Sequence, residues 1–284
     1  MAGADSAGTD PAQIRSVIAT GALAEKKGLC IVAGTQRRHQ VQYRDLLPRI
    51  HDGAIGEIVC AEAYWVGDYG YYPAVLRQQG WSDMEAQLRN WNYFTWLSGD
   101  HIVEQHVHNL DIMNWALQGH PVKAFGLGGR QQRTGAEFGH IYDHFSVEFE
   151  YANGVRVQSL CRQNSDTYER VAERIVGTLG TCDPRKGITG KNAYAWAGED
   201  SNPYVEEHKH LVKAIRAGIP INEAKQVAES TMAAIMGRMA CYTGEEVTWD
   251  FAMNESKLSL LPEKFELSSL PTPEVAVPGV TKLI

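Results

Sequence analysis

Four strand-like runs in the middle of the chain limit the possible folds more than any other feature. They cover residues 123–127, 144–151, 155–161 and 173–177. Asn153 and Gly154 separate two alternating runs, and Asn-Gly in that position is the strongest short-range signal for a β-hairpin. A further strand is expected at 58–66, after the turn at Asp52 and Gly53. The pattern predicts an open, largely antiparallel sheet.

Three helical patterns flank these runs. One begins at Pro11, where Thr9 or Asp10 can cap it, and ends near Gly28. The other two cover residues 203–217 and 223–243, and each is followed by a glycine. The fold class that we expect is therefore α/β, of the α+β kind, with helices on one face of the sheet.

The first forty residues have a different pattern. After the helix that begins at Pro11, a continuous apolar run at 29–32 leads into a polar turn at 34–40. This is the pattern of the last helix and buried strand of a doubly wound fold. No Gly-x-Gly-x-x-Gly follows a strand in this chain, and the glycine-rich stretch 126–129 precedes no helical pattern, so it is not a phosphate-binding loop.

Composition excludes several classes of partner. The net charge of -7 and the pI near 5.8 argue against nucleic acid and anionic membranes, and a small polar substrate is expected instead. The five cysteines are scattered without a Cys-x-x-Cys pair, which predicts reduced and mostly buried thiols. The start of the chain lacks an export signal and no stretch is long and apolar enough to cross a bilayer, so a cytoplasmic location is expected.

The segment 67–97 is rich in aromatic residues and shows little periodicity, which predicts a long loop. Its aromatic rings suit the apolar faces of sugar rings, although core packing is the commoner role of such residues. The residues in question are Tyr69, Tyr71, Tyr72, Trp81, Trp91, Tyr93 and Trp96.

Six short sequence strings occur one after another along the chain. They are VAGTQRRHQ, DGAIGEI, GDHIVEQHVHNLDIMNWALQGHPV, VGTLGT, NPYVEEHKHLVKAIRAGIPINEA and YTGEEVTWDFAMN. Because the strings occur in this order and spacing, the chain from about residue 12 to residue 284 resembles the Gfo/Idh/MocA family of NAD(P)-dependent sugar and cyclitol dehydrogenases. The resemblance implies that residues 1–40 are a remnant of the NAD(P)-binding Rossmann domain. Residues 41–284 would be the substrate-binding and oligomerisation domain.

The same resemblance implies a set of catalytic residues. Glu104, His108 and Asp111 match the substrate motif of the family, with Glu104 in place of the more usual Asp. Residues at i, i+4 and i+7 share one face of a helix. His108 would be the base or proton relay for oxidation of a hydroxyl group, Glu104 would bind sugar hydroxyls or orient His108, and Asp111 would hold the helix or the imidazole.

Further residues complete the expected site. Arg37 and Arg38 would face the nicotinamide of NAD or NADP, or else form a solvated basic turn. His144, Arg162 and Trp91 are the remaining candidates for substrate binding. A dense set of possible metal ligands surrounds them, but His106 and His108 stand two residues apart and point to different sides of a helix, so no bound metal is expected.

Three functions are compatible with these observations. The first is hydride transfer between NAD(P) and a hydroxyl of a sugar or polyol, impaired in this chain because the Gly-rich loop and the family's catalytic Lys are missing from it. The second is a cofactor-independent or metal-dependent lyase or glycoside hydrolase that uses Glu104 and His108. The third is a non-catalytic assembly module. We also expect the chain to form a homo-oligomer through the open sheet face.

Overall fold

The computed structural model describes residues 6–67 and 72–284. Within them, nine strands form one sheet in the order β8-β7-β6-β5-β1-β4-β3-β2-β9. The strands are β1 (Ile58–Gly67), β2 (Pro121–Gly129), β3 (His144–Tyr151), β4 (Arg156–Gln163), β5 (Arg170–Gly177), β6 (Gly180–Asp183), β7 (Gly187–Gly190), β8 (Tyr194–Ala195) and β9 (Val247–Thr248). All neighbouring pairs are antiparallel except β1 and β4, which confirms the expected sheet.

The hairpin at Asn153 and Gly154 is confirmed. Gly154 has a φ of +80°, a conformation that glycine adopts without steric cost. Its N–H donates to the carbonyl of Tyr151 at 2.8 Å, and the N–H of Tyr151 donates to the carbonyl of Val155 at 2.9 Å. The turn sets the register of β3 and β4, in which His144 lies opposite Arg162.

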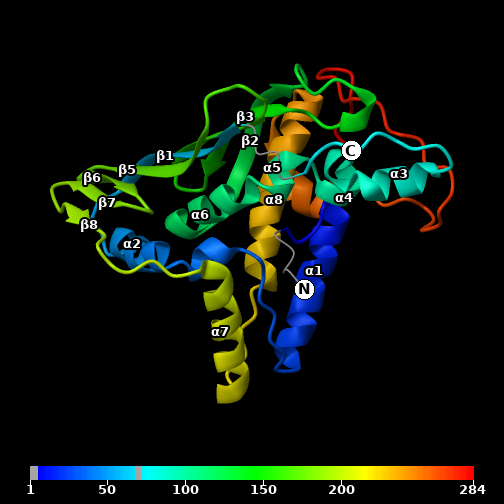
Figure 1. Ribbon diagram of the computed structural model, residues 1–284. Coiled ribbons are helices and arrows are strands. Elements are labelled where there is room, and N and C mark those ends of the chain that lie inside the picture. Colours follow the sequence, from blue (N-terminus) through cyan, green and yellow to red (C-terminus); the bar gives the residue numbers. More distant parts are fainter. Residues whose placement is uncertain (1–5, 68–71) are drawn as a thin grey trace.

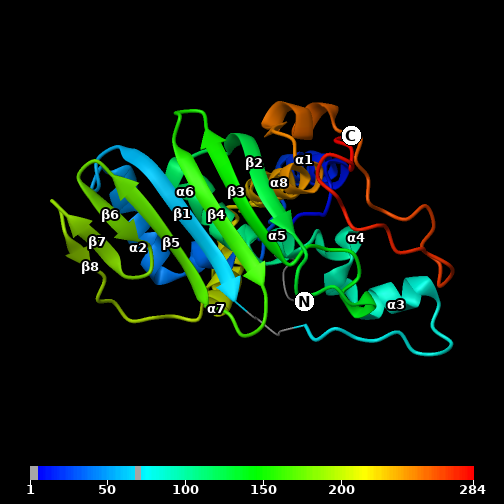
Figure 2. The same ribbon diagram turned by 90° about the horizontal axis from the view of Figure 1, so that it is seen from above.

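The helices cover one face of the sheet and leave the other open (Figures 1 and 2). They are α1 (Pro11–Lys26), α2 (Val41–His51), α3 (Asp83–Arg89), α4 (Thr95–Ser98), α5 (His101–Glu104), α6 (Val107–Leu117), α7 (Pro203–Ala217) and α8 (Ala224–Thr243). Short 3-10 helices occur at Gln36–His39, Trp91–Tyr93 and Ala136–Phe138, and a π-helix at Phe251–Glu255. None of the described helices is long and apolar enough to cross a membrane.

Local capping signals explain the ends of the long helices. The carboxylate of Asp10 accepts a hydrogen bond from the N–H of Gln13 at 2.8 Å, and Pro11 occupies the first turn of α1. Gly218 and Gly244 adopt the left-handed conformation directly after α7 and α8. The helices expected from the sequence at these positions are therefore confirmed.

Helix α8 lies at the centre of the helical layer. It packs against α1, α6 and β2, and most of its residues are buried. Gly237 of α8 lets β3 and α5 approach closely, because a Cβ atom there would lie 3.0 Å from Phe149 and 3.1 Å from Ile102. Ile14 of α1 belongs to the same hydrophobic core as Phe149 of β3. The division of the chain at residue 40 stays a prediction.

Two local expectations differ from the structure. The run 29–32 forms no strand. Within the described residues, its only sheet-like contact is one parallel bridge between Ile31 and Asn222, and the side chain of Leu29 is half exposed. The segment 67–97 contains α3, α4 and the 3-10 helix Trp91–Tyr93 rather than only loop, and Ser82 caps α3 by accepting from the N–H of Glu85. Tyr69 and Tyr71 lie outside the described residues.

The five cysteines are free thiols, and three of them are buried. Burial raises the pKa of Cys182 and of Cys241 to about 12. The expectation of reduced, mostly buried thiols is confirmed.

Candidate functional site

Glu104 and His108 lie on two different helices. Glu104 ends α5, whereas His108 and Asp111 belong to α6, so the single helix expected from the spacing is wrong. The interruption falls at Gln105 and His106. Both side chains are tied to β4: Gln105 accepts from the amide of Gln163 at 2.6 Å, and His106 lies 2.7 Å from the hydroxyl of Ser159. These long-range contacts break the helix where the local pattern would continue it.

Glu104 borders a cavity of about 520 Å³. Three aromatic side chains of the preceding segment, those of Tyr72, Trp91 and Trp96, line it as well. The rings of Tyr72 and Trp91 meet edge to face with their centroids 4.8 Å apart. Ser98 contributes a further part of the wall. The arrangement combines one carboxylate with aromatic surface, which are the two features that bind the hydroxyls and the apolar faces of a sugar.

His108 is deeply buried. It is 5% exposed and stacks on Trp65, with ring centroids 6.0 Å apart. Burial lowers the pKa of His108 to about 3, and the positive charge of Arg37 acts in the same direction. The imidazole is therefore neutral near pH 7 and can accept a hydrogen bond there. His108 is not among the described residues that line the Glu104 cavity.

Arg37 is held by partners within the chain. Its guanidinium forms an ion pair with Glu173 and lies over the ring of Trp65, 5.5 Å from the centroid. Glu173 also accepts hydrogen bonds from the hydroxyl of Tyr43 at 2.9 Å and from the amide of Asn109 at 2.6 Å. Arg37 thus joins the turn before α2 to β5 and to α6.

Arg38 forms a bidentate pair with Asp111. Its Nε and Nη2 donate to the two carboxylate oxygens at 2.8 Å and 3.0 Å. Asp111 also accepts from the hydroxyl of Ser230 at 2.8 Å and from the amide of Gln226 at 3.0 Å. The carboxylate of Asp111 therefore fastens α6 to α8.

His144 and Arg162 lie at a second cavity on the open face of the sheet. They are opposite each other on β3 and β4, and neither lines the cavity of Glu104. Nδ1 of His144 donates to the carboxylate of Asp143 at 2.7 Å. Although burial opposes ionisation, the hydrogen bonds from His144 and from three backbone N–H groups hold the pKa of Asp143 well below its usual range. The structure thus divides the expected substrate residues between two places.

Comparison with known proteins places part of the chain in a family. Residues 43–183 match the sequence family described as the GFO/IDH/MocA C-terminal domain. This segment belongs to the Gfo/Idh/MocA family. No curated protein sequence matches the chain.

Solved structures share the fold of this chain at low sequence identity. The aldose-aldose oxidoreductase from Caulobacter crescentus, in complex with glycerol, is 16% identical, with a TM-score of 0.64 over 84% of this chain and 69% of that chain. The myo-inositol 2-dehydrogenase from Lactobacillus plantarum is 15% identical, with a TM-score of 0.63 over 85% and 70%. An oxidoreductase from Agrobacterium radiobacter, in complex with NAD+, L-tartaric acid and magnesium, is 14% identical, with a TM-score of 0.59 over 84% and 70%.

The described residues of this chain do not fit a dinucleotide. Arg37 and Arg38 are engaged by Glu173 and Asp111, and the run 29–32 makes only a bridge. A dinucleotide needs a glycine-rich turn between a strand and a helix N-terminus for its pyrophosphate, and the described part of the chain has none. No step of hydride transfer can therefore be assigned to groups of this chain. The same residues contain no group of three or more His, Cys, Asp or Glu side chains arranged to hold a metal ion.

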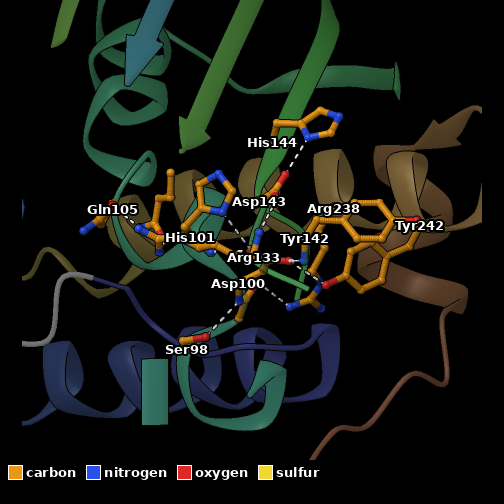
Figure 3. A network of polar contacts seen from close by, with 12 residues as sticks. Ser98, Asp100, His101, Gln105, Arg133, Tyr142, Asp143, His144, Arg238 and Tyr242 are labelled. Atoms are coloured by element: carbon orange, nitrogen blue, oxygen red, sulfur yellow. Dashed lines mark hydrogen bonds and ion pairs between the residues drawn. The ribbon is translucent and has the colours of Figure 1, made fainter. Parts of the chain in front are cut away.

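A buried polar network positions α5, and sequence reasoning missed its two central residues (Figure 3). The carboxylate of Asp100 accepts from the N–H of Tyr142 at 2.9 Å, from the hydroxyl of Tyr242 at 2.6 Å and from the N–H of His101 at 2.6 Å. Arg238 of α8 donates to the carbonyls of Gly99 and Thr9, each at 2.8 Å. Asp100 before an apolar stretch is a helix-capping signal that could have been noticed, whereas nothing local marks Arg238.

Proposed function

We propose that this chain is the substrate-binding part of an oxidoreductase that acts on a sugar or a polyol. The observation that carries the proposal is the cavity in which the carboxylate of Glu104 meets the rings of Tyr72, Trp91 and Trp96. The aromatic faces exclude water from the apolar face of a sugar ring, and the carboxylate accepts hydrogen bonds from its hydroxyls. The aldose-aldose oxidoreductase bound to glycerol and the inositol dehydrogenase, which share this fold, support the same class of ligand.

The residues of the site then have separate tasks. Glu104 binds hydroxyl groups, and Trp91 stacks on the ring of the substrate. His108 is the proton acceptor that the family motif assigns, although its lowered pKa makes it a weak base and it does not line the Glu104 cavity. Asp111 and Arg38 hold α6, and with it His108, against α8.

NAD or NADP is the coenzyme that we propose for the reaction, on the family relationship and on the NAD+ complex of the Agrobacterium radiobacter oxidoreductase. Because the described residues do not fit a dinucleotide, this chain by itself should bind NADH and NADPH weakly and should turn over poorly. Leu23, Leu29, Ile215 and Ile219, on and after α1 and α7, are exposed apolar side chains that a nucleotide-binding domain would cover.

Ligand binding to three variants tests the sugar site. Titration calorimetry with myo-inositol, glucose and glycerol should show binding that falls about tenfold or more in Glu104→Gln and in Trp91→Ala, since each removes a direct contact with the ligand. Trp81→Ala is the matched control, because Trp81 belongs to the same aromatic segment but pairs with Arg89 outside the cavity. Equal losses in Trp91→Ala and Trp81→Ala would contradict the site.

The same titrations with NADH and NADPH test the coenzyme. Low-micromolar affinity of this chain for either dinucleotide would show that its residues form a dinucleotide site after all. Cleavage of a glycoside without added coenzyme would instead support a lyase or hydrolase that uses Glu104 and His108, and would count against the oxidoreductase.

We also propose that the chain forms a homo-oligomer through the open sheet face. Phe125 and Leu127 of β2 point from this face and are 50% and 70% exposed. Apolar side chains of this size on an uncovered sheet favour association with a second copy.

A further inference from the structure

Most cationic side chains on the open sheet face have a carboxylate partner. Arg174 of β5 lies 3.1 Å from Glu62 of β1. Arg156 of β4 and Lys123 of β2 lie 3.7 Å and 3.6 Å from the carboxylate of Glu150 on β3. On this part of the face, positive charges are neutralised by neighbouring strands.

Arg162 and Arg170 differ from these residues. In residues 6–67 and 72–284, neither has an ion-pair partner. Arg162 donates to the carbonyl of Tyr168 at 3.0 Å, and the guanidinium of Arg170 lies over the ring of Tyr64, 3.8 Å from its centroid. Among the described residues, two positive charges are thus left without a neutralising carboxylate, although the net charge of the chain is -7.

The sheet register brings these two arginines to the same place. Both lie opposite Val66 of β1, Arg162 from β4 and Arg170 from β5. Directly paired residues point to the same face of a sheet, and two strand spacings separate the two backbones by about 9–10 Å. Arginine side chains are long enough to meet above Val66. His144 continues the row, because it lies opposite Arg162 on β3.

A cavity of about 620 Å³ lies at this row. Arg162, Arg170, His144, Tyr64 and Asn164 are among its lining residues, and it shares none of its lining with the cavity of Glu104. Nε of Arg162 and Oδ1 of Asn164 are buried and lack a hydrogen-bond partner in the described part of the chain. One buried guanidinium donor and one buried amide acceptor beside the cavity are therefore unused.

We propose that this cavity binds the phosphate group of a small phosphorylated, hydroxyl-bearing molecule. A phosphate monoester carries close to two negative charges at neutral pH, which match the two unpaired guanidinium groups, and its oxygens fit the planar donor fork of arginine. Oδ1 of Asn164 accepts a hydrogen bond from a hydroxyl of the same ligand. The site is separate from the sugar cavity beside Glu104 and does not depend on the proposed sugar binding. Because Ser146, one of its lining residues, lies opposite Leu127 on the face that we propose for self-association, a bound phosphate and a second copy of the chain compete for this face.

Titration with inorganic phosphate, glycerol 3-phosphate and glycerol tests the proposal. The full chain should bind one phosphate or glycerol 3-phosphate per chain, with glycerol 3-phosphate the tighter of the two, and glycerol should not compete for this site. Arg162→Gln and Arg170→Gln should each weaken binding about tenfold or more, because each removes a charge-assisted hydrogen bond to the phosphate. Arg174→Gln, which removes a paired arginine of the same face, is the matched control and should leave the affinity unchanged.

A second variant and a second readout distinguish loss of phosphate binding from loss of folding in Arg170→Gln. Arg170→Lys keeps the charge, and circular dichroism of every variant reports whether the fold is intact. Affinity that falls as much in Arg174→Gln as in Arg162→Gln would show a general charge effect and overturn the proposal. Failure of the unaltered chain to bind either phosphate compound would also overturn it, and so would binding in folded Arg162→Gln at the original affinity.

Discussion

At the scale of single residues, three buried histidines near the candidate site are held in the neutral form. Burial lowers the pKa of His106 and of His108 to about 3 and that of His140 to about 4. His106 and His140 each have one ring nitrogen within hydrogen-bond distance of a hydroxyl, that of Ser159 at 2.7 Å and that of Thr95 at 2.9 Å. Protonation of any of the three would place a charge inside the core.

The stability of the chain should therefore fall in mild acid. The folded pKa of each histidine lies below its unfolded value of about 6.5, so the unfolded chain binds more protons below that pH. This contribution to stability is complete above pH 6.5 and is lost as the pH falls toward 3–4, by about 1.4 kcal/mol per histidine and pH unit. Urea unfolding between pH 7.5 and pH 5 measures it.

A histidine variant separates this effect from the titration of other groups. His106→Gln should reduce the slope of unfolding free energy against pH by about 1.4 kcal/mol per pH unit, because the contribution of one buried histidine is gone. His208→Gln is the control, since its side chain is 62% exposed, and should leave the slope unchanged. An unaltered slope in His106→Gln would contradict the explanation.

At the scale of elements, close packing explains the glycine-rich stretch of β2. A Cβ atom on Gly126 would lie 2.7 Å from Sγ of Cys241 and 2.9 Å from the carbonyl oxygen of Ser146. A Cβ atom on Gly128 would lie 2.8 Å from the carbonyl oxygen of His144. Strand β2 thus runs so close to α8 and β3 that there is no room for side chains on its inner face at these positions. The stretch serves packing, as its place in a strand indicates.

Gly126→Ala should consequently destabilise the fold. The added methyl group must push β2 away from α8, and overpacking of a well-packed core costs about 1–3 kcal/mol. Gly119→Ala is the control, because its nearest contact would be 3.9 Å away, and it should change the free energy of unfolding by less than about 0.5 kcal/mol. Urea unfolding at pH 7.5 compares the two. Equal stability of both variants would mean that β2 and α8 do not pack as closely as the structure has them.

At the scale of the whole molecule, the sheet is covered on one face only (Figure 2). The open face carries the paired charges of its central strands and, on β2, the exposed side chains of Phe125 and Leu127. We expect this face to bind a second copy of the chain.

Leu127→Glu tests that expectation. A charge at the centre of an apolar contact should convert the oligomer into a monomer, which sedimentation velocity or light scattering measures directly. Leu88→Glu, a substitution of an exposed leucine on α3 away from the sheet face, should leave the mass unchanged. A monomeric unaltered chain at all accessible concentrations would rule out association through this face.

Features that depend on a few neighbouring residues can be predicted from the sequence alone. Asp10 and Pro11 begin α1, Gly218 and Gly244 end α7 and α8, and the turn at Gly154 joins β3 to β4, because caps and turns are set by the conformational preferences of a few adjacent residues. The four strand-like runs were recognised for the same reason, since alternation of apolar and polar residues is local.

The grouping of the candidate residues depends instead on contacts between distant segments. The spacing of Glu104 and His108 indicates one helix, but contacts of Gln105 and His106 with β4 separate them onto α5 and α6. The sequence predicts that Arg37 faces a cofactor, but in the structure Arg37 forms an ion pair with Glu173, which lies 136 positions further along the chain. Ion pairs, burial and cavities arise between segments that are distant in sequence, so their energies decide the site only after the sheet and helices have brought those segments together.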